Sequence, residues 1–251
     1  MPYGLYVSAE GAHAQSKRLE VIANNLANVD TPGFKRDVPL FKARLAEATQ
    51  RGLDHFGSGS INDVGGGVTV DATLTDFSAG PIRDTGIPTD MAIDGDAFFM
   101  VQKGDQQLLT RAGNFAINDE ATLVTHDGYP VLSADGSPIV ISPDDGPWYL
   151  TDDGAVSQAG NTTPVALVRP QSAGDLVKLG ENLFAPLAPP EPLAAEERHV
   201  FSGQLEGSGV RPTIEMMEMI EASRTFEANT NIIHYHDQTM GNLINRILKE
   251  N

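Results

Sequence analysis

Seven-residue repeats at the two ends of the chain are the feature that most constrains its fold. Near the N-terminus, leucine or alanine recurs every seven residues, and a small residue follows four positions after each of the first three. This alternation of four and three is the heptad pattern of a helix that packs lengthwise against another helix. It predicts a helix over residues 4–28, ended where Thr31 precedes a proline and Gly33 suits a turn. The predicted seam is Leu5, Ala9, Ala12, Ser16, Leu19, Ala23 and Leu26.

The C-terminal end carries a longer version of the same pattern. Pro212 suits the first turn of a helix, and no glycine follows until Gly241. A helix over residues 212–249 would be about 57 Å long at 1.5 Å per residue. So long a seam needs a partner, and the N-terminal seam is the nearest candidate, with Asn229 and His236 as polar residues that fix the register. This seam is Met219, Ala222, Phe226, Asn229, Ile233, His236, Met240, Leu243 and Ile247.

The middle of the chain has the pattern of a β domain. Between residues 69 and 185, short apolar runs are separated by turn residues, and Asp-Gly occurs at 94–95, 127–128, 135–136, 145–146 and 153–154. Asp-Gly between such runs indicates tight hairpins, because their turns need positive φ. We therefore predict an α+β chain, with paired terminal helices in a coiled-coil-like layer and a central, mostly antiparallel β domain. The expected plan is a helical assembly domain (1–33 and 205–251), a linking segment (34–70) and a β-rich outer domain with a proline-rich connector (71–204).

The charge is concentrated in the middle of the chain. The formal charge is −17, and residues 51–200 hold 22 Asp and Glu against 7 Lys and Arg. An acidic body repels nucleic acid and anionic membrane, so neither is an expected partner. The chain has no cysteine, no apolar stretch of about 20 residues that could span a bilayer, and no N-terminal pattern of a cleaved signal peptide. Work outside the cytoplasm would therefore require a dedicated export route.

No group of residues has the pattern of a catalytic, cofactor or metal site. His234 and His236 are two residues apart, so on a helix they point to different sides and do not converge on a metal. The acidic turns lack the spacing of a calcium loop, and the glycines at 65–67 are not followed by the residues of a phosphate loop. We expect a non-enzymatic protein without cofactors. Trp148 and Tyr149 leave one alternative open: a secreted glycan-binding β protein with oligomerising helices.

Several long motifs resemble the bacterial flagellar rod and hook proteins. Residues 22–35 (IANNLANVDTPGFK) resemble the N-terminal signature of that family, and residues 205–210 with 215–229 (EMMEMIEASRTFEAN) resemble its C-terminal signature. The middle also matches, at residues 76–88, 92–99, 110–115 and 123–128. The resemblance covers most of the chain. It adds Asn24, Asn25 and Asn28 of the N-terminal signature to the expected assembly interface.

The resemblance implies a structural role. In this family, paired terminal helices line the inner tube of an axial polymer and the β domain forms the outer layer. The expected partners are copies of the chain and other rod proteins, with a surrounding ring or peptidoglycan as further neighbours. The resemblance also implies a rod that transmits torque across the periplasm and is exported by the flagellar type III system. The chain length and residues 205–208 favour the proximal part of the rod, and the distal part is the alternative.

Overall fold

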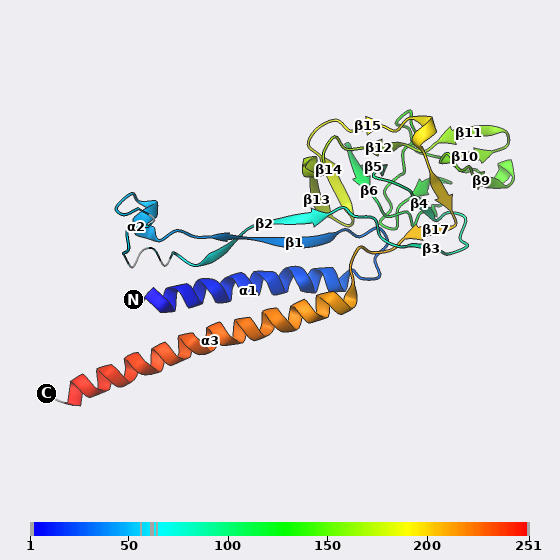
Figure 1. Cartoon of the computed structure of the whole chain (residues 1–251). Coiled ribbons are helices and arrows are strands. Elements are labelled where there is room, and N and C mark those ends of the chain that lie inside the picture. The colour runs from blue at the N-terminus through cyan, green and yellow to red at the C-terminus, as the bar shows by residue number, and fades with distance from the viewer. Residues whose placement is uncertain (1–2, 56, 61–62, 64, 250–251) are drawn as a thin grey trace. The chain divides into compact units, whose positions relative to one another are not determined.

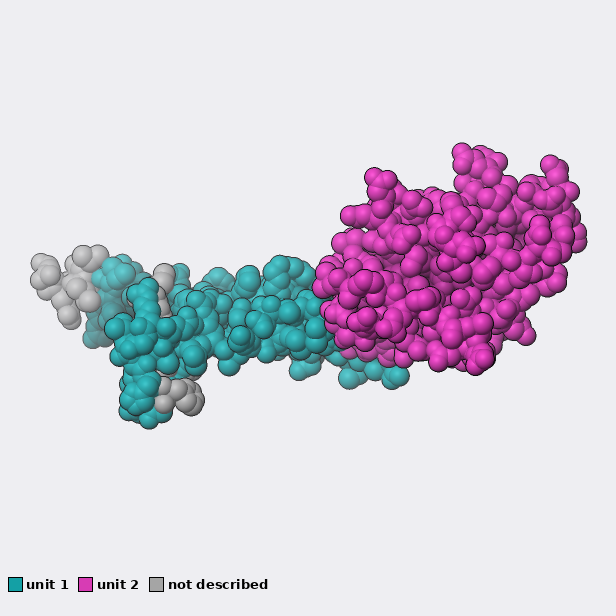
Figure 2. All heavy atoms as spheres, turned by 90° about the horizontal axis from the view of Figure 1, so that it is seen from above, with its two compact units in different colours: residues 1–27, 37–75, 211–251 teal, residues 28–36, 76–210 magenta. Residues whose placement is uncertain are grey.

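A computed structural model describes residues 3–55, 57–60, 63 and 65–249 of the 251-residue chain. The chain forms two compact units, each built from separate stretches of sequence (Figure 2). The helical unit comprises residues 1–27, 37–75 and 211–251, and the β unit comprises residues 28–36 and 76–210. This division differs from the expected plan, because most of the expected linking segment belongs to the helical unit.

The helical unit contains two long helices and a two-stranded sheet (Figure 1). Helix α1 spans Tyr3–Ala27 and helix α3 spans Pro212–Lys249, and the two pack against each other. Both predicted terminal helices are therefore confirmed, with bounds within one residue, because proline starts α3 and the Thr31-Pro32 pair follows α1. The remaining elements are β1 (Arg36–Ala43), β2 (Val68–Asp76) and the short helix α2 (Glu47–Gln50) between them.

The β unit is antiparallel in every strand pairing of its described residues, which confirms the α+β prediction. Its largest sheet has six strands in the order β13-β14-β6-β5-β12-β15, and a second sheet has the order β11-β10-β9. The six strands are Leu176–Gly180, Leu183–Pro186, Gln106–Thr110, Phe98–Lys103, Leu167–Arg169 and Glu191–Pro192, in sheet order. The second sheet contains Asn161–Pro164, Ala155–Gln158 and Trp148–Leu150.

Three short strand pairs complete the β unit. They join β3 to β17, β4 to β16 and β7 to β8. In that order the strands are Ile82–Asp84 with Gln204–Glu206, Met91–Ile93 with Val200–Ser202, and Ala116–Ile117 with Leu123–Val124. Short 3-10 helices occupy Pro143–Asp145, Ala173–Asp175 and Ala195–Glu197.

The two faces of the six-stranded sheet bury separate apolar clusters. Successive side chains of a strand point to opposite faces, so Phe98 and Phe99 of β5 belong to different clusters. Phe99 packs edge-on against Phe115 in the main core, with ring centroids 5.0 Å apart. On the other face, Phe98 lies 5.9 Å from Phe184 between centroids. The core of the β unit is thus formed entirely within that unit.

The prediction made from the Asp-Gly dipeptides is confirmed for backbone conformation and only partly confirmed for hairpins. All five glycines have positive φ, between +74° and +91°. The turns at 127–128, 135–136 and 153–154 bring flanking residues into antiparallel pairing. The hairpin prediction is wrong at 94–95, because β4 and β5 pair with other strands, and at 145–146, where the glycine ends a 3-10 helix. The prediction of a proline-rich connector is also corrected, because that segment contains the end of β14 and the strand β15.

Candidate assembly interface

The two helices of the helical unit meet in a register that repeats every seven residues. Gly4 of α1 lies opposite His236 of α3, since a Cβ built on Gly4 would lie 3.3 Å from His236 Nε2. Seven residues further along α1, Gly11 lies opposite Asn229, and a Cβ built there would lie 3.2 Å from Asn229 Nδ2. Glycine removes the side chain that would keep these two polar groups away. The two helices therefore approach each other closely at the positions where α3 carries these polar side chains.

The same register continues through charged residues. One Arg18 nitrogen lies 3.7 Å from a carboxylate oxygen of Glu218 and 3.6 Å from one of Glu221. Asn25, another seven residues along α1, donates from Nδ2 to Glu215 Oε2 over 3.4 Å. Position numbers rise by seven on α1 as they fall by seven on α3, so the helices are antiparallel. A one-heptad slip would separate every one of these polar pairs.

Asn25 connects both long helices and the two-stranded sheet of the helical unit. It is buried, and besides Glu215 its Nδ2 donates to the Asp37 carbonyl over 2.8 Å, while its Oδ1 accepts from the Asp37 N–H over 2.9 Å. One amide side chain therefore links α1 to α3 and to β1. Of the other two signature asparagines, Asn24 is exposed on α1 and Asn28 is half-buried in the β unit.

Two of the seam residues predicted on α3, Asn229 and His236, lie opposite glycines of α1. Ala222 is fully buried beside Glu218 and Glu221, which face α1. Met240 and Leu243 are 42% and 53% exposed, because they lie beyond the point where Gly4 meets His236. The side chain of Ile247 lies outside the described residues. The half-buried seam residues are Met219, Phe226, Asn229, Ile233 and His236.

The seam predicted on α1 is displaced around the helix. Leu5, Leu19 and Leu26 are half-buried and Ala12 is buried, but Ala9 and Ala23 are exposed and Ser16 is half-buried. The positions with direct α3 contacts are instead Gly4, Gly11, Arg18 and Asn25. The prediction of Ala9 and Ala23 as seam residues is wrong. The reason is that α1 also faces the segment at the end of β1, where Arg44, directly after the strand, lies 3.0 Å from Glu10, so two different faces of α1 are partly buried.

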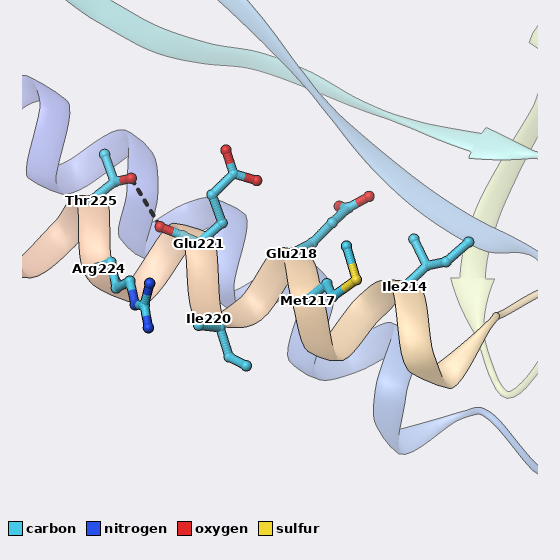
Figure 3. A pocket seen from close by; sticks show the side chains of 7 residues that line it. All are labelled: Ile214, Met217, Glu218, Ile220, Glu221, Arg224 and Thr225. Atoms are coloured by element: carbon cyan, nitrogen blue, oxygen red, sulfur yellow. Dashed lines mark hydrogen bonds between the residues drawn. The ribbon is translucent and has the colours of Figure 1, made fainter.

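An exposed apolar face of α3 was not anticipated. Ile214, Met217 and Ile220 are 42%, 67% and 56% exposed and line a shallow groove with Glu218, Glu221, Arg224 and Thr225 (Figure 3). Spacing of three residues puts these apolar side chains on one side of the helix. That spacing was the available signal, and the stronger heptad obscured it. Further exposed apolar residues in the helical unit include Leu40, Phe41, Leu74, Ile232, Tyr235 and Ile244.

Comparison with known proteins decides what kind of protein has these helices. Three family models match: "Flagella basal body rod protein" at residues 5–35, "Flagellar hook protein FlgE/F/G D1 domain" at 92–158, and "Flagellar basal body rod FlgEFG protein C-terminal" at 202–246. The rod protein FlgF of Caulobacter vibrioides is 34% identical over 91% of both chains. FlgG of Bacillus subtilis is 34% identical over 96% of this chain and 97% of its own. The chain belongs to the flagellar rod and hook protein family.

Membership of the rod and hook family makes the chain a structural, non-enzymatic protein of the flagellar basal body. Within the described residues, no three His, Cys, Asp or Glu side chains are grouped as they would be around a metal ion. His236 faces Gly4 while His234 is exposed, as expected for positions two apart. Across the same residues, no helix combines the length and apolar character that a membrane span requires.

The glycan-binding alternative depended on the adjacent pair Trp148 and Tyr149. Trp148 and Tyr149 are adjacent in β9, so their side chains point to opposite faces of the strand. Trp148 packs against the main core, whereas Tyr149 is exposed. The pair therefore cannot form one stacking platform for a sugar.

Proposed function

We propose that this chain polymerises through its helical unit into the flagellar rod, the axial shaft that transmits motor torque across the periplasm. The observation that carries the proposal is the apolar surface of α3 around Ile214, Met217 and Ile220, in a chain whose relatives are named rod proteins. A contiguous exposed apolar surface of this kind is typical of an interaction site. A shaft requires contacts that repeat without closing, which a helix face can provide when it meets a different surface of the next copy.

The interface is tested by placing charge in the groove. Met217→Asp with Ile220→Asp would put two carboxylates where apolar contact is expected, so the variant should fold but fail to join the rod. Ile87→Asp is the matched control, because Ile87 is an exposed apolar residue of the β unit. Motility and recovery of the chain in purified basal bodies are the measurements. Normal incorporation of the double variant would overturn the proposed interface.

The proximal part of the rod is the proposed position, with the distal part as the alternative. The support is the chain length and the residues at 205–208, and the relatives include both FlgF and FlgG. Because a shaft grows from its base, loss of a proximal subunit should remove the whole rod beyond it, whereas loss of a distal subunit should leave a stub. Electron cryotomography of cells lacking the gene distinguishes these outcomes. A complete rod in those cells would contradict both positions.

Export by the flagellar type III system is part of the same proposal. Helix α1 belongs to the proposed assembly interface, so this route must deliver it to the rod uncut. Mass spectrometry of the chain from purified basal bodies should therefore find the residues of α1 intact. A product shortened within residues 3–27 would contradict this route.

A further inference from the structure

The β unit buries an ion triad outside its apolar core. Lys35, Arg111 and Glu206 are only 1%, 3% and 3% exposed. Lys35 Nζ lies 2.7 Å from Glu206 Oε1, and Arg111 Nη1 lies 3.3 Å from Glu206 Oε2. Buried charges are costly to remove from water, and replacing them by apolar residues is often neutral for stability. A triad of two cations and one carboxylate is therefore poorly explained by stability alone.

The triad connects three segments that are far apart in sequence. Glu206 Oε1 accepts from the Gly80 N–H, and the Glu206 carbonyl accepts from the Gly33 N–H, each over 2.8 Å. Lys35 Nζ donates to the Ser78 carbonyl over 2.9 Å. Lys35 and residues 78–80 are thereby held to the Glu206 carboxylate and its cations, and Gly33 is held to the Glu206 backbone. We call this group of contacts the Glu206 clamp.

The segments of the clamp also contact one another through their backbones. Gly207 N–H donates to the Pro81 carbonyl over 2.8 Å, and a Cβ built on Gly80 would lie 2.1 Å from the Gly207 carbonyl oxygen. A Cβ built on Gly33 would lie 2.4 Å from the Arg111 carbonyl. These distances leave no room for a side chain. The segments are therefore in direct backbone contact.

Arg111 anchors the clamp to the rest of the β unit. Its Nη1 also donates to the Ile93 carbonyl over 3.4 Å, and its Nη2 donates to the Gly95 carbonyl. Ile93 ends β4 and belongs to the main core. The clamp is thus attached to a strand as well as to the chain segments around it.

The clamp lies close in sequence to every point where the chain passes between the two units. The chain passes between the two units four times, at 27/28, 36/37, 75/76 and 210/211. Each passage lies within a few residues of a segment that the clamp holds. We propose that Glu206 is the positioning residue of a mechanical joint, which holds together all four chain passages where they leave the β unit. Force on the helical unit then enters the β unit through the clamp, a step that rests on the proposed rod function.

Hydrogen exchange of the isolated full chain tests the joint without the rod. In Glu206→Gln, Lys35 and Arg111 lose their counter-charge, so exchange of the Gly33, Gly80 and Gly207 amides should rise by at least about tenfold. The amides of Leu123 and Val131, which are bonded within the core, should change far less. An equal rise at both sets of amides, or no rise at the clamp, would overturn the proposal.

A matched control removes the same charge from an exposed pair. Glu181 lies 2.5 Å from Lys103 in the β unit, and both side chains are more than two-fifths exposed. Glu181→Gln should leave exchange at Gly33 and Gly80 unchanged. An increase there equal to that in Glu206→Gln would show that the clamp is not special. If Glu206→Gln does not fold, Lys35→Met keeps the Arg111–Glu206 pair and should still raise exchange at Gly80.

Swimming under load tests the mechanical step. Cells with Glu206→Gln should assemble rods but lose speed in viscous medium to a greater degree than cells with Glu181→Gln. Equal speed of the two strains at every viscosity would overturn the mechanical role, even if the clamp amides exchange faster. Absence of the unaltered chain from the rod would instead refute the proposed function, and the exchange result on the isolated chain would stand.

Discussion

The β unit and the helical unit satisfy their apolar residues in different ways. The β unit encloses two clusters of its own, whereas the helical unit leaves apolar residues exposed along α3, β1 and β2. The two units also differ in charge: the β unit has 21 acidic and 8 basic residues, and the helical unit has 13 acidic and 9 basic residues. The β unit also has exposed apolar residues such as Ile87, but it encloses its own core, so the contrast supports the proposal that the helical unit carries the assembly surface.

The strongest test of this comparison is removal of a core aromatic ring. Phe99 is fully buried against Phe115, so Phe99→Ala should cost the β unit about 4 kcal/mol of unfolding free energy. The single tryptophan, Trp148, packs on this core and reports its urea transition by fluorescence. Helical circular dichroism reports mainly the other unit. A helical signal that shifts to lower urea together with the tryptophan transition would show that the two units unfold as one.

A smaller loss of unfolding free energy is expected where two backbone segments are in contact. In Gly80→Ala the new Cβ would meet the Gly207 carbonyl oxygen at 2.1 Å, so the backbone must move, at a cost of about 2 kcal/mol. The tryptophan transition again gives the measurement. Gly174→Ala is the control, because its nearest contact is the Ser172 hydroxyl at 3.6 Å. Equal stability of the two variants would mean that the approach at Gly80 is not restrictive.

The seam of the helical unit should respond to charge without affecting the β unit. Phe226 is half-buried on α3, so Phe226→Asp should weaken the helix pair by roughly 1 to 2 kcal/mol and block assembly. The tryptophan transition should stay unchanged. Ala228→Asp adds the same charge at an exposed position of the same helix and should assemble. Normal motility with Phe226→Asp would refute the role of the seam.

The parts that could be predicted from sequence are those with local signals. Helix α3 has proline at its start and a heptad facing one neighbour, and Asp-Gly dipeptides specify positive φ. The α1 face was missed because Gly4 and Gly11 meet polar side chains, which a hydrophobic pattern does not register. The clamp was missed for a different reason. Lys35, Arg111 and Glu206 are distant in sequence, and charged residues ordinarily lie at the surface.

The smallest expected effect concerns pH. Burial lowers the pKa of Lys35, against the opposing attraction of Glu206. Between that lowered pKa and the ordinary value of 10.5, the unfolded chain binds more protons than the folded chain, so stability rises with pH in this window. The cost of the buried charge is complete below the folded pKa and is gone above 10.5. Lys35→Met lacks this group, so the unfolding free energy of the unaltered chain should rise relative to that of the variant as pH increases towards 10.5. A constant difference across this window would mean that burial of Lys35 in the β unit does not lower its pKa, and would contradict this prediction.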